Sequence, residues 1–220
     1  MNLEQLIASF RVDADDLVEP FLFQDEWVAG WLTDAQAEAA IRGRLILEDA
    51  NPAVCQIAVT AGIASYELHR SVYEIADLRF APTGASQSTP LTLVSREWLD
   101  DKRPGWRDLA GEGAYAIQTD HRLRLVGVPA SDGVLHLEAY RVPIKALAND
   151  TDKPELNEAH HRHLVQWALH RAFSRPDAET IDPQRADRAL VAFTRYFGMA
   201  PDSDLRRSTR HDLQQTNALW

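Results

Sequence analysis

The spacing of apolar residues divides the chain into helical ends and a strand-rich middle. Apolar side chains recur three or four positions apart, as one face of a helix requires, over residues 2–10, 33–49 and 154–174. Further helices are expected from residue 25, from residue 95 and over residues 183–198. The expected caps are Asn2, Thr33 and Ser95 at helix starts and Gly198 at the end of the last helix. Asn51-Pro52 interrupts this pattern, because a proline disfavours helix at the preceding residue. We therefore place an architectural boundary at residue 51.

After this boundary the chain alternates between apolar and polar positions, as strands with one buried face do. The segments with this pattern are residues 56–61, 65–69, 72–80, 91–94, 115–119, 122–128 and 134–142. Turns at Asp120-His121 and Ser131-Asp132-Gly133 separate the last three of them. The middle of the chain is therefore expected to be an antiparallel β-rich region.

The expected fold class is α+β. Neither the N-terminal helices nor the C-terminal pair makes a convincing core alone, so the simplest packing joins them in one bundle. This bundle would be discontinuous, formed by residues 1–50 and 154–198, with residues 51–153 inserted as the β-rich domain. Periodicity is lost after Gly198, so residues 199–220 are expected to form an extended C-terminal tail.

Charge is concentrated near the N-terminus. The net charge of the 220 residues is −10, and residues 1–50 contain 11 acidic but only 3 basic side chains. An acidic segment repels phosphate, which makes tight DNA binding through it improbable; a solvated helical face is the simplest interpretation. No run of about 18 apolar residues occurs, and the first ten residues lack the pattern of a signal peptide, so no membrane partner is expected.

Histidines form the one cluster that suggests metal chemistry. His160, His161 and His163 lie close together, and His170 follows seven positions after His163. Histidines three apart on a helix can chelate zinc, but the His-Glu-x-x-His spacing is absent, and a polar face or a subunit interface is the alternative. Cys55, the only cysteine, excludes an internal disulfide and is most simply a small buried side chain. No catalytic residue and no cofactor are predicted.

The C-terminal tail has the composition of a docking peptide. Trp220 ends a polar segment that contains Arg206, Arg207 and Arg210, so an apolar anchor lies beside positive charges. A plain disordered terminus is the alternative.

Several motifs, in order along the chain, resemble one protein family. They are the run from Pro90 to Asp100 (Pro-Leu-Thr-Leu-Val-Ser-Arg-Glu-Trp-Leu-Asp), Pro104-Gly105-Trp106, Arg122-Leu-Arg-Leu-Val-Gly-Val-Pro129 and Glu138-Ala-Tyr-Arg-Val-Pro143. The C-terminal half adds Pro154-Glu-Leu, His161, Trp167-Ala-Leu-His-Arg-Ala-Phe, Pro176-Asp-Ala-Glu-Thr and the segment from Phe193 to Gly198; the opening Trp31-Leu-Thr-Asp-Ala-Gln is a looser match. Together they resemble the head-to-tail adaptors, also called connector or tail tubular proteins, of short-tailed phages.

This resemblance implies a structural protein rather than an enzyme. It implies a virion component, made in the host cytoplasm, that assembles as a homo-oligomeric ring, commonly of twelve subunits, between the portal protein and the next tail or nozzle protein. DNA would pass through the ring as non-specific cargo and leave through it at ejection. In such proteins the C-terminal extension reaches into the portal. The resemblance therefore implies that the portal-binding residues are Leu205, Arg206, Arg207, Arg210, Leu213, Leu219 and Trp220. An acidic channel would leave the duplex mobile, and we expect its lining to include Asp13, Asp15, Asp16 and Glu19.

Two other classes of function stay open. One is a metal-dependent enzyme or metal-binding protein that uses His160, His161 and His163. The other is a regulatory module whose acidic helices mimic DNA and bind a basic partner, which salt-sensitive binding would reveal.

Overall fold

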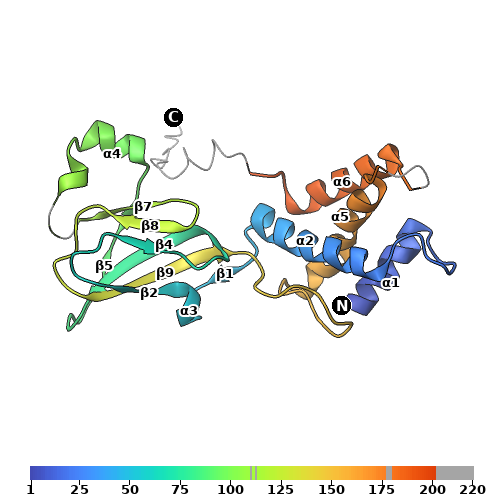
Figure 1. Cartoon of the computed structure of the whole chain (residues 1–220), viewed down its shortest axis with the longest axis horizontal. Coiled ribbons are helices and arrows are strands. Elements are labelled where there is room, and N and C mark those ends of the chain that lie inside the picture. Colours follow the sequence, from blue (N-terminus) through green and yellow to red (C-terminus); the bar gives the residue numbers. More distant parts are fainter. Residues whose placement is uncertain (110, 112, 177–179, 202–220) are drawn as a thin grey trace, which may run out of the picture. The chain divides into compact units, whose positions relative to one another are not determined.

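The structure is a computed structural model that describes residues 1–109, 111, 113–176 and 180–201. The chain forms two compact units (Figure 1). Unit 1 contains Met1–Ile46 and Val142–Ala200, and unit 2 contains Leu47–Arg141. The α+β class expected from the sequence is confirmed. Residues 142–153, which the sequence pattern assigned to the β-rich domain, belong to unit 1, because Leu147 is buried among its helices.

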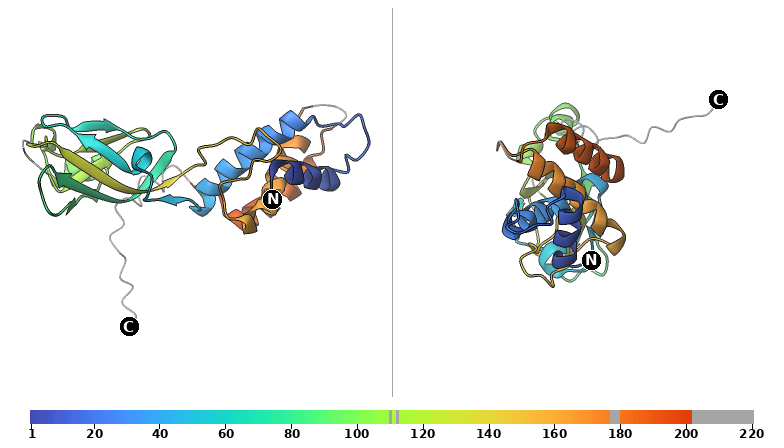
Figure 2. Two further views of the ribbon diagram at one scale, coloured as in Figure 1. Left: turned by 90° about the horizontal axis from the view of Figure 1, so that it is seen from below. Right: turned by 90° about the vertical axis from the view of Figure 1, so that its right-hand side faces the viewer.

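Unit 1 is a bundle of helices drawn from both ends of the chain, visible end-on in Figure 2. Its helices are α1 (Leu3–Ala14), α2 (Asp25–Gly43), α5 (His161–Phe173) and α6 (Pro183–Phe197), with the short 3-10 helix η2 (Glu158–His160) before α5. Helix α5 contacts α1, α2 and α6. It therefore joins the N-terminal pair to the C-terminal part of the chain.

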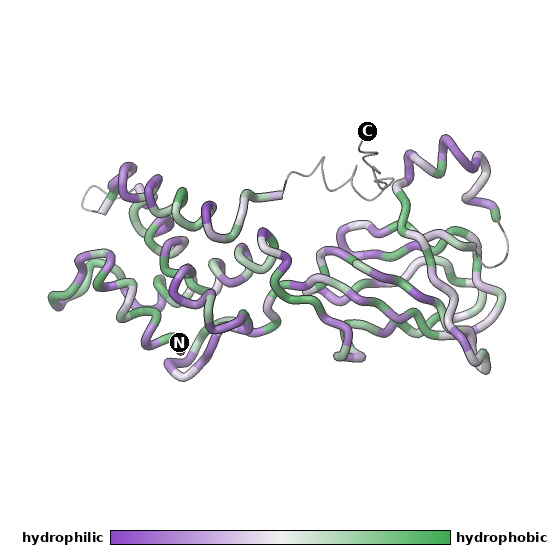
Figure 3. Tube along the Cα trace, turned by 180° about the vertical axis from the view of Figure 1, so that it is seen from behind, coloured by the Kyte–Doolittle hydropathy of each residue, from purple (hydrophilic) through white to green (hydrophobic). Residues whose placement is uncertain are grey.

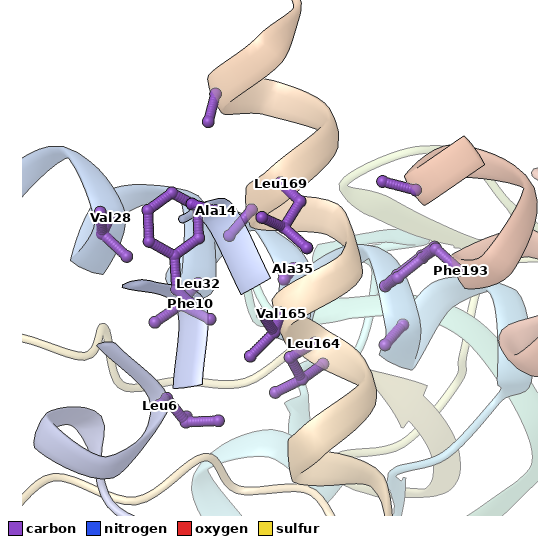
Figure 4. Close-up of a cluster of buried hydrophobic side chains, with 14 of the residues drawn as sticks. Leu6, Phe10, Ala14, Val28, Leu32, Ala35, Leu164, Val165, Leu169 and Phe193 are labelled. Carbon is purple, nitrogen blue, oxygen red and sulfur yellow. The ribbon is translucent and has the colours of Figure 1, made fainter. Parts of the chain in front are cut away.

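The core of unit 1 is built around α5 (Figure 4). Leu164 and Val165 are fully buried, and the labelled side chains of α1 and α2 point toward the same region. Phe10, Phe23 and Phe173 add edge-to-face ring contacts across three segments of the chain. Burying an aliphatic or aromatic side chain of this size stabilises the fold by roughly 1.5–3 kcal/mol. The bundle is therefore held mainly by contacts between residues far apart in sequence.

The helix ends follow the expected capping chemistry. Asn2 and Gln5 cap α1 reciprocally, since each side chain accepts a hydrogen bond from the backbone N–H of the other. Gly198 ends α6 with a positive φ of 97°, and its N–H donates to Thr194. The caps predicted at Asn2 and Gly198 are confirmed.

Two helix boundaries were predicted wrongly. Residues 25–49 were expected to form two helices with Thr33 as a cap, but α2 is continuous through Thr33, whose hydroxyl instead accepts from the N–H of Leu147. The alanine-rich sequence after Thr33 favours helix, so the helix that begins at Asp25 continues through Thr33. Helix α5 begins at His161 rather than Pro154, because Asn157 caps a short 3-10 turn that precedes it.

Unit 2 contains two sheets. The first comprises β1 (Leu47–Glu48), β2 (Gln56–Val59), β4 (Val72–Pro82), β5 (Thr89–Pro90) and β9 (Gly133–Arg141), and the second comprises β3 (Ser65–Glu67), β6 (Thr92–Leu93), β7 (Tyr115–Gln118) and β8 (Arg122–Leu125). In the first sheet β9 pairs antiparallel with β1, β2 and β4. The second is antiparallel except for β6, which runs parallel to β7. Among the described strand pairs, the expected antiparallel arrangement therefore holds for all but this one.

The two sheets share one hydrophobic core. Leu78, Phe80, Leu135 and Leu137 from the first sheet and Leu123 from the second are buried in a single cluster. Short helices flank the strands: α3 (Pro52–Cys55), α4 (Arg96–Lys102) and the 3-10 turn η1 (Trp106–Asp108). Ser95 caps α4 as predicted, and Trp106 packs in a separate small core with Leu99. No described helix is long and apolar enough to span a bilayer.

The aromatic side chain Phe193 provides a test of this packing. Phe193 is fully buried in unit 1, whereas Val191, two positions earlier on α6, is 65% exposed. We expect Phe193→Ala to lower the free energy of unfolding of unit 1 by about 3–5 kcal/mol, because it leaves a cavity in the core. Val191→Ala should change it by less than about 0.5 kcal/mol. Urea unfolding followed by far-ultraviolet circular dichroism at helical wavelengths measures both; equal stability of the two variants would contradict the packing.

Candidate functional site

The loop between α1 and α2 is organised by one buried arginine. The Arg11 guanidinium donates to the Asp16 carboxylate at 2.7 Å and to the carbonyl of Phe23 at 2.9 Å, and it also pairs with Asp25. Asp16 in turn accepts hydrogen bonds from the backbone N–H groups of Leu22 and Phe23 at 2.9 and 3.2 Å. The loop, residues 15–24, is named the tip loop here. Its two ends are therefore tied to a single charged group.

Two of the acids predicted to line a channel are bound within unit 1, Asp16 by Arg11 and Asp13 by Arg162. Asp16 is only 3% exposed, so its carboxylate supports the loop from inside instead of facing a surface. Asp13 accepts two 2.8 Å hydrogen bonds from Arg162 on α5. Asp15 and Glu19 are exposed, and within the described part of the chain neither forms an ion pair. The channel hypothesis stays untested and now concerns mainly Asp15 and Glu19.

The tip loop also exposes apolar side chains that the sequence analysis did not select. Leu17, Val18 and Leu22 are 62%, 79% and 53% exposed. Figure 3 shows hydrophobic colour at this loop, at the edge of unit 1 beyond the helix ends. The apolar residues between Asp16 and Gln24 were a usable signal, because connecting loops are usually polar.

The predicted histidine cluster is divided among separate structural contacts. His161 is buried, its Nε2–H donates to the carbonyl of Leu156 at 2.8 Å, and its Nδ1 lies 2.9 Å from the Met1 amino nitrogen. His170 donates through Nδ1 to the carbonyl of Ala186 at 3.1 Å. The ring of His163 stacks on Tyr196 with 3.5 Å between centroids, and His160 shares a 3.2 Å hydrogen bond with the hydroxyl of Tyr196. Each ring is used in packing or hydrogen bonding.

The histidines therefore do not form a metal site in this conformation. Within residues 1–109, 111, 113–176 and 180–201, no group of three or more His, Cys, Asp or Glu side chains is arranged to hold a metal ion. Burial lowers the pKa of His163, and the charges of Arg162 and His160 lower it further. The neutral ring is thus favoured, which suits its stacking on Tyr196.

Cys55 is the last residue of α3 in unit 2. Its thiol is buried and donates to the carbonyl of Glu48 at 3.2 Å. Burial raises the pKa of the Cys55 thiol, as do the negative charges of Glu48 and Asp49. A thiolate is the nucleophilic form of cysteine, so these surroundings oppose covalent catalysis.

The outer surface of α5 and α6 carries a shallow groove. Its lining combines apolar side chains with polar and basic ones: His163, Gln166, Arg188, Val191, Ala192, Arg195 and Tyr196. Arg188 and Arg195 are exposed, and neither forms an ion pair with another described residue. The groove is therefore a basic and partly apolar surface with no partner in the described part of this chain.

A comparison with protein-family models matches residues 1–216 to the family described as SU10 adaptor protein. The chain belongs to the SU10 adaptor protein family. This match covers both units, and it confirms the resemblance to phage head-to-tail adaptors that the sequence motifs carried. A comparison with curated proteins gives no match.

Membership defines this protein as a phage adaptor and hence as a virion component. The predicted portal-binding residues of the adaptor, from Leu205 to Trp220, lie outside the described residues. Their role stays a prediction.

Asp16 is the residue through which the Arg11 network can be tested. We expect Asp16→Asn to destabilise unit 1 of the adaptor by about 3–5 kcal/mol, because the change leaves a buried guanidinium without its buried counter-charge. Asp15→Asn is the matched control, since Asp15 is exposed and asparagine tolerates its left-handed backbone with φ of 60°. Its effect should stay within about 0.5 kcal/mol. Chemical denaturation of both variants measures the difference, and indistinguishable midpoints would show that the buried pair contributes little.

Proposed function

We propose that this adaptor is a non-enzymatic structural protein that forms a ring beneath the portal, links the portal to the next tail protein and surrounds part of the DNA channel. The observation that carries the proposal is the family match over residues 1–216. The polar side chains buried in the fold support it, because Arg11, Asp16 and His161 are engaged in structural hydrogen bonds. A ring of twelve copies is the stoichiometry proposed, with portal and tail proteins as partners.

A metal-dependent enzyme is the weaker second candidate. It requires His160, His161 and His163 to converge on one ion, whereas His161 is buried and already hydrogen-bonded through both ring nitrogens. Forming the site would need these contacts to break. Metal analysis of the purified adaptor tests this candidate, and stoichiometric zinc lost in a His160→Ala/His163→Ala variant would support it against the structural role.

DNA passage is the second part of the proposal. A wall of carboxylates repels phosphate and leaves the duplex free to move, which is the physical reason to seek acids on the channel surface. Asp15 and Glu19 are the exposed acids among those predicted from the sequence. The apolar side chains of Leu17, Val18 and Leu22 around them favour a contact with protein instead.

The tail is proposed to dock into the portal. Unit 1 keeps all four of its helices when the chain ends at Gly198, because α6 ends at Phe197. The chain beyond it offers apolar anchors such as Leu205 and Trp220 beside three arginines, a composition suited to ordering on a partner surface.

Truncation after Gly198 tests the docking role. We expect the shortened adaptor to fold, with an unchanged helical circular dichroism signal, but to lose binding to the portal ring of the same phage. Native mass spectrometry of the portal with and without adaptor provides the measurement. The control is a full-length chain whose residues 199–220 are scrambled, which keeps the length and charge of the tail. Undiminished binding by the truncated chain would exclude the tail as the docking element.

A further inference from the structure

The tip loop has the features of a preorganised protein-binding element. Its ends are held by Arg11 and Asp16, and the Arg11 guanidinium also lies 3.6 Å from the centroid of the Phe21 ring. A loop already fixed in one conformation loses little further entropy when it binds. It presents Leu17, Val18 and Leu22 to solvent despite this support, so the exposure is built into the fold.

The exposed charges of the tip loop are both negative, because they belong to Asp15 and Glu19. The sequence from Asp13 to Glu26 contains six acids and no lysine or arginine. The arginines that contact this segment come from other parts of the chain. Asp15 and Glu19 are exposed and have no ion-pair partner among described residues. The tip loop therefore calls for a partner surface that is apolar and positively charged.

The groove on α5 and α6 has this complementary chemistry. Val191 is 65% exposed and Tyr196 is 42% exposed, and Arg188 and Arg195 flank them. Two other arginines of these helices already bind within the chain: Arg162 binds the Asp13 carboxylate, and Arg185 donates to the Asp13 carbonyl. Arg188 and Arg195 are left to meet charges from outside the described part of the chain.

We propose that the tip loop of one adaptor copy docks into the α5–α6 groove of a second copy. Leu17 and Val18 would cover Val191 and Tyr196, and Asp15 and Glu19 would face Arg188 and Arg195. The inference rests on the proposed ring, and it identifies the two surfaces that hold neighbouring subunits together.

The symmetry of this contact suits a ring. The two surfaces are different parts of the same unit, so one copy contributes its loop and the next contributes its groove. A pair joined by such a heterologous contact has a free loop at one end and a free groove at the other. Further copies can therefore be added until the assembly closes into a ring. An isologous contact would stop at a dimer.

Charge exchange between the two surfaces tests the docking. The loop variant is Asp15→Asn/Glu19→Arg, in which asparagine is chosen because Asp15 has a positive φ. The groove variant is Arg188→Glu/Arg195→Glu. Each variant alone should raise the adaptor concentration needed to fill the portal ring by at least about tenfold, because like charges then face one another. The combination of both changes in one chain should restore filling, since opposite charges face one another again.

The matched control is Glu4→Arg/Asp150→Asn, which makes the same change in net charge at two exposed acids of unit 1 outside the tip loop. Filling is measured as adaptor copies per portal by native mass spectrometry, with circular dichroism to confirm folding. If the wild-type adaptor does not join the portal, the proposed function itself fails. If the wild type fills the ring and the loop variant fills it equally well, the docking inference is overturned; altered DNA ejection by that variant would then return Asp15 and Glu19 to the channel wall.

Cross-linking provides a test that does not depend on charge. A Val18→Cys copy mixed with a Val191→Cys copy on the portal should form a covalent pair with a short bismaleimide, whereas either variant alone should not. The native Cys55 is buried and should stay unmodified. Rings that fill normally without forming this mixed pair would overturn the proposed contact.

Discussion

The fold depends on the mutual burial of helices from opposite ends of the chain. Helix α5 supplies the central apolar surface, with Leu164 and Val165 fully buried and contacts to α1, α2 and α6. The N-terminal helices cannot bury their apolar faces without it, because their partners lie more than a hundred residues away in sequence. This requirement makes the β-rich unit an insertion between the two parts of the bundle. It also couples the order of the N-terminal region to the C-terminal helices.

One buried ion pair determines what unit 1 presents on its surface. Because Arg11 binds Asp16 and the backbone of Phe23, the tip loop is supported from inside and its apolar residues remain outside. Burying such a pair costs desolvation energy, so its contribution to stability is modest compared with the penalty for breaking it. Its main consequence is positional. The loop keeps a defined shape at the edge of the bundle, which a docking element requires.

An adaptor needs surfaces more than it needs reactive groups, and the distribution of polar residues agrees with this. His161, His170 and Cys55 have ordinary structural partners, whereas Arg188 and Arg195 lie on the outside of α6. The unit therefore combines an interior whose buried arginine and histidine are hydrogen-bonded with a surface that has one acidic apolar area and a separate basic apolar area. That separation is the property that allows one copy to recognise another in a fixed direction.

The sequence by itself determined the α+β class, the caps at Asn2, Ser95 and Gly198, and the family, because these depend on local periodicity, capping chemistry and ordered motifs. It did not determine that α2 runs unbroken through Thr33, since the Thr33 hydroxyl is used by the distant N–H of Leu147. Nor could it separate the four acids of residues 13–19: only the tertiary structure buries Asp16 against Arg11 and pairs Asp13 with Arg162. The physical reason is the same in each case. Burial and long-range pairing decide what a polar side chain does, and both depend on residues that sequence spacing does not bring together.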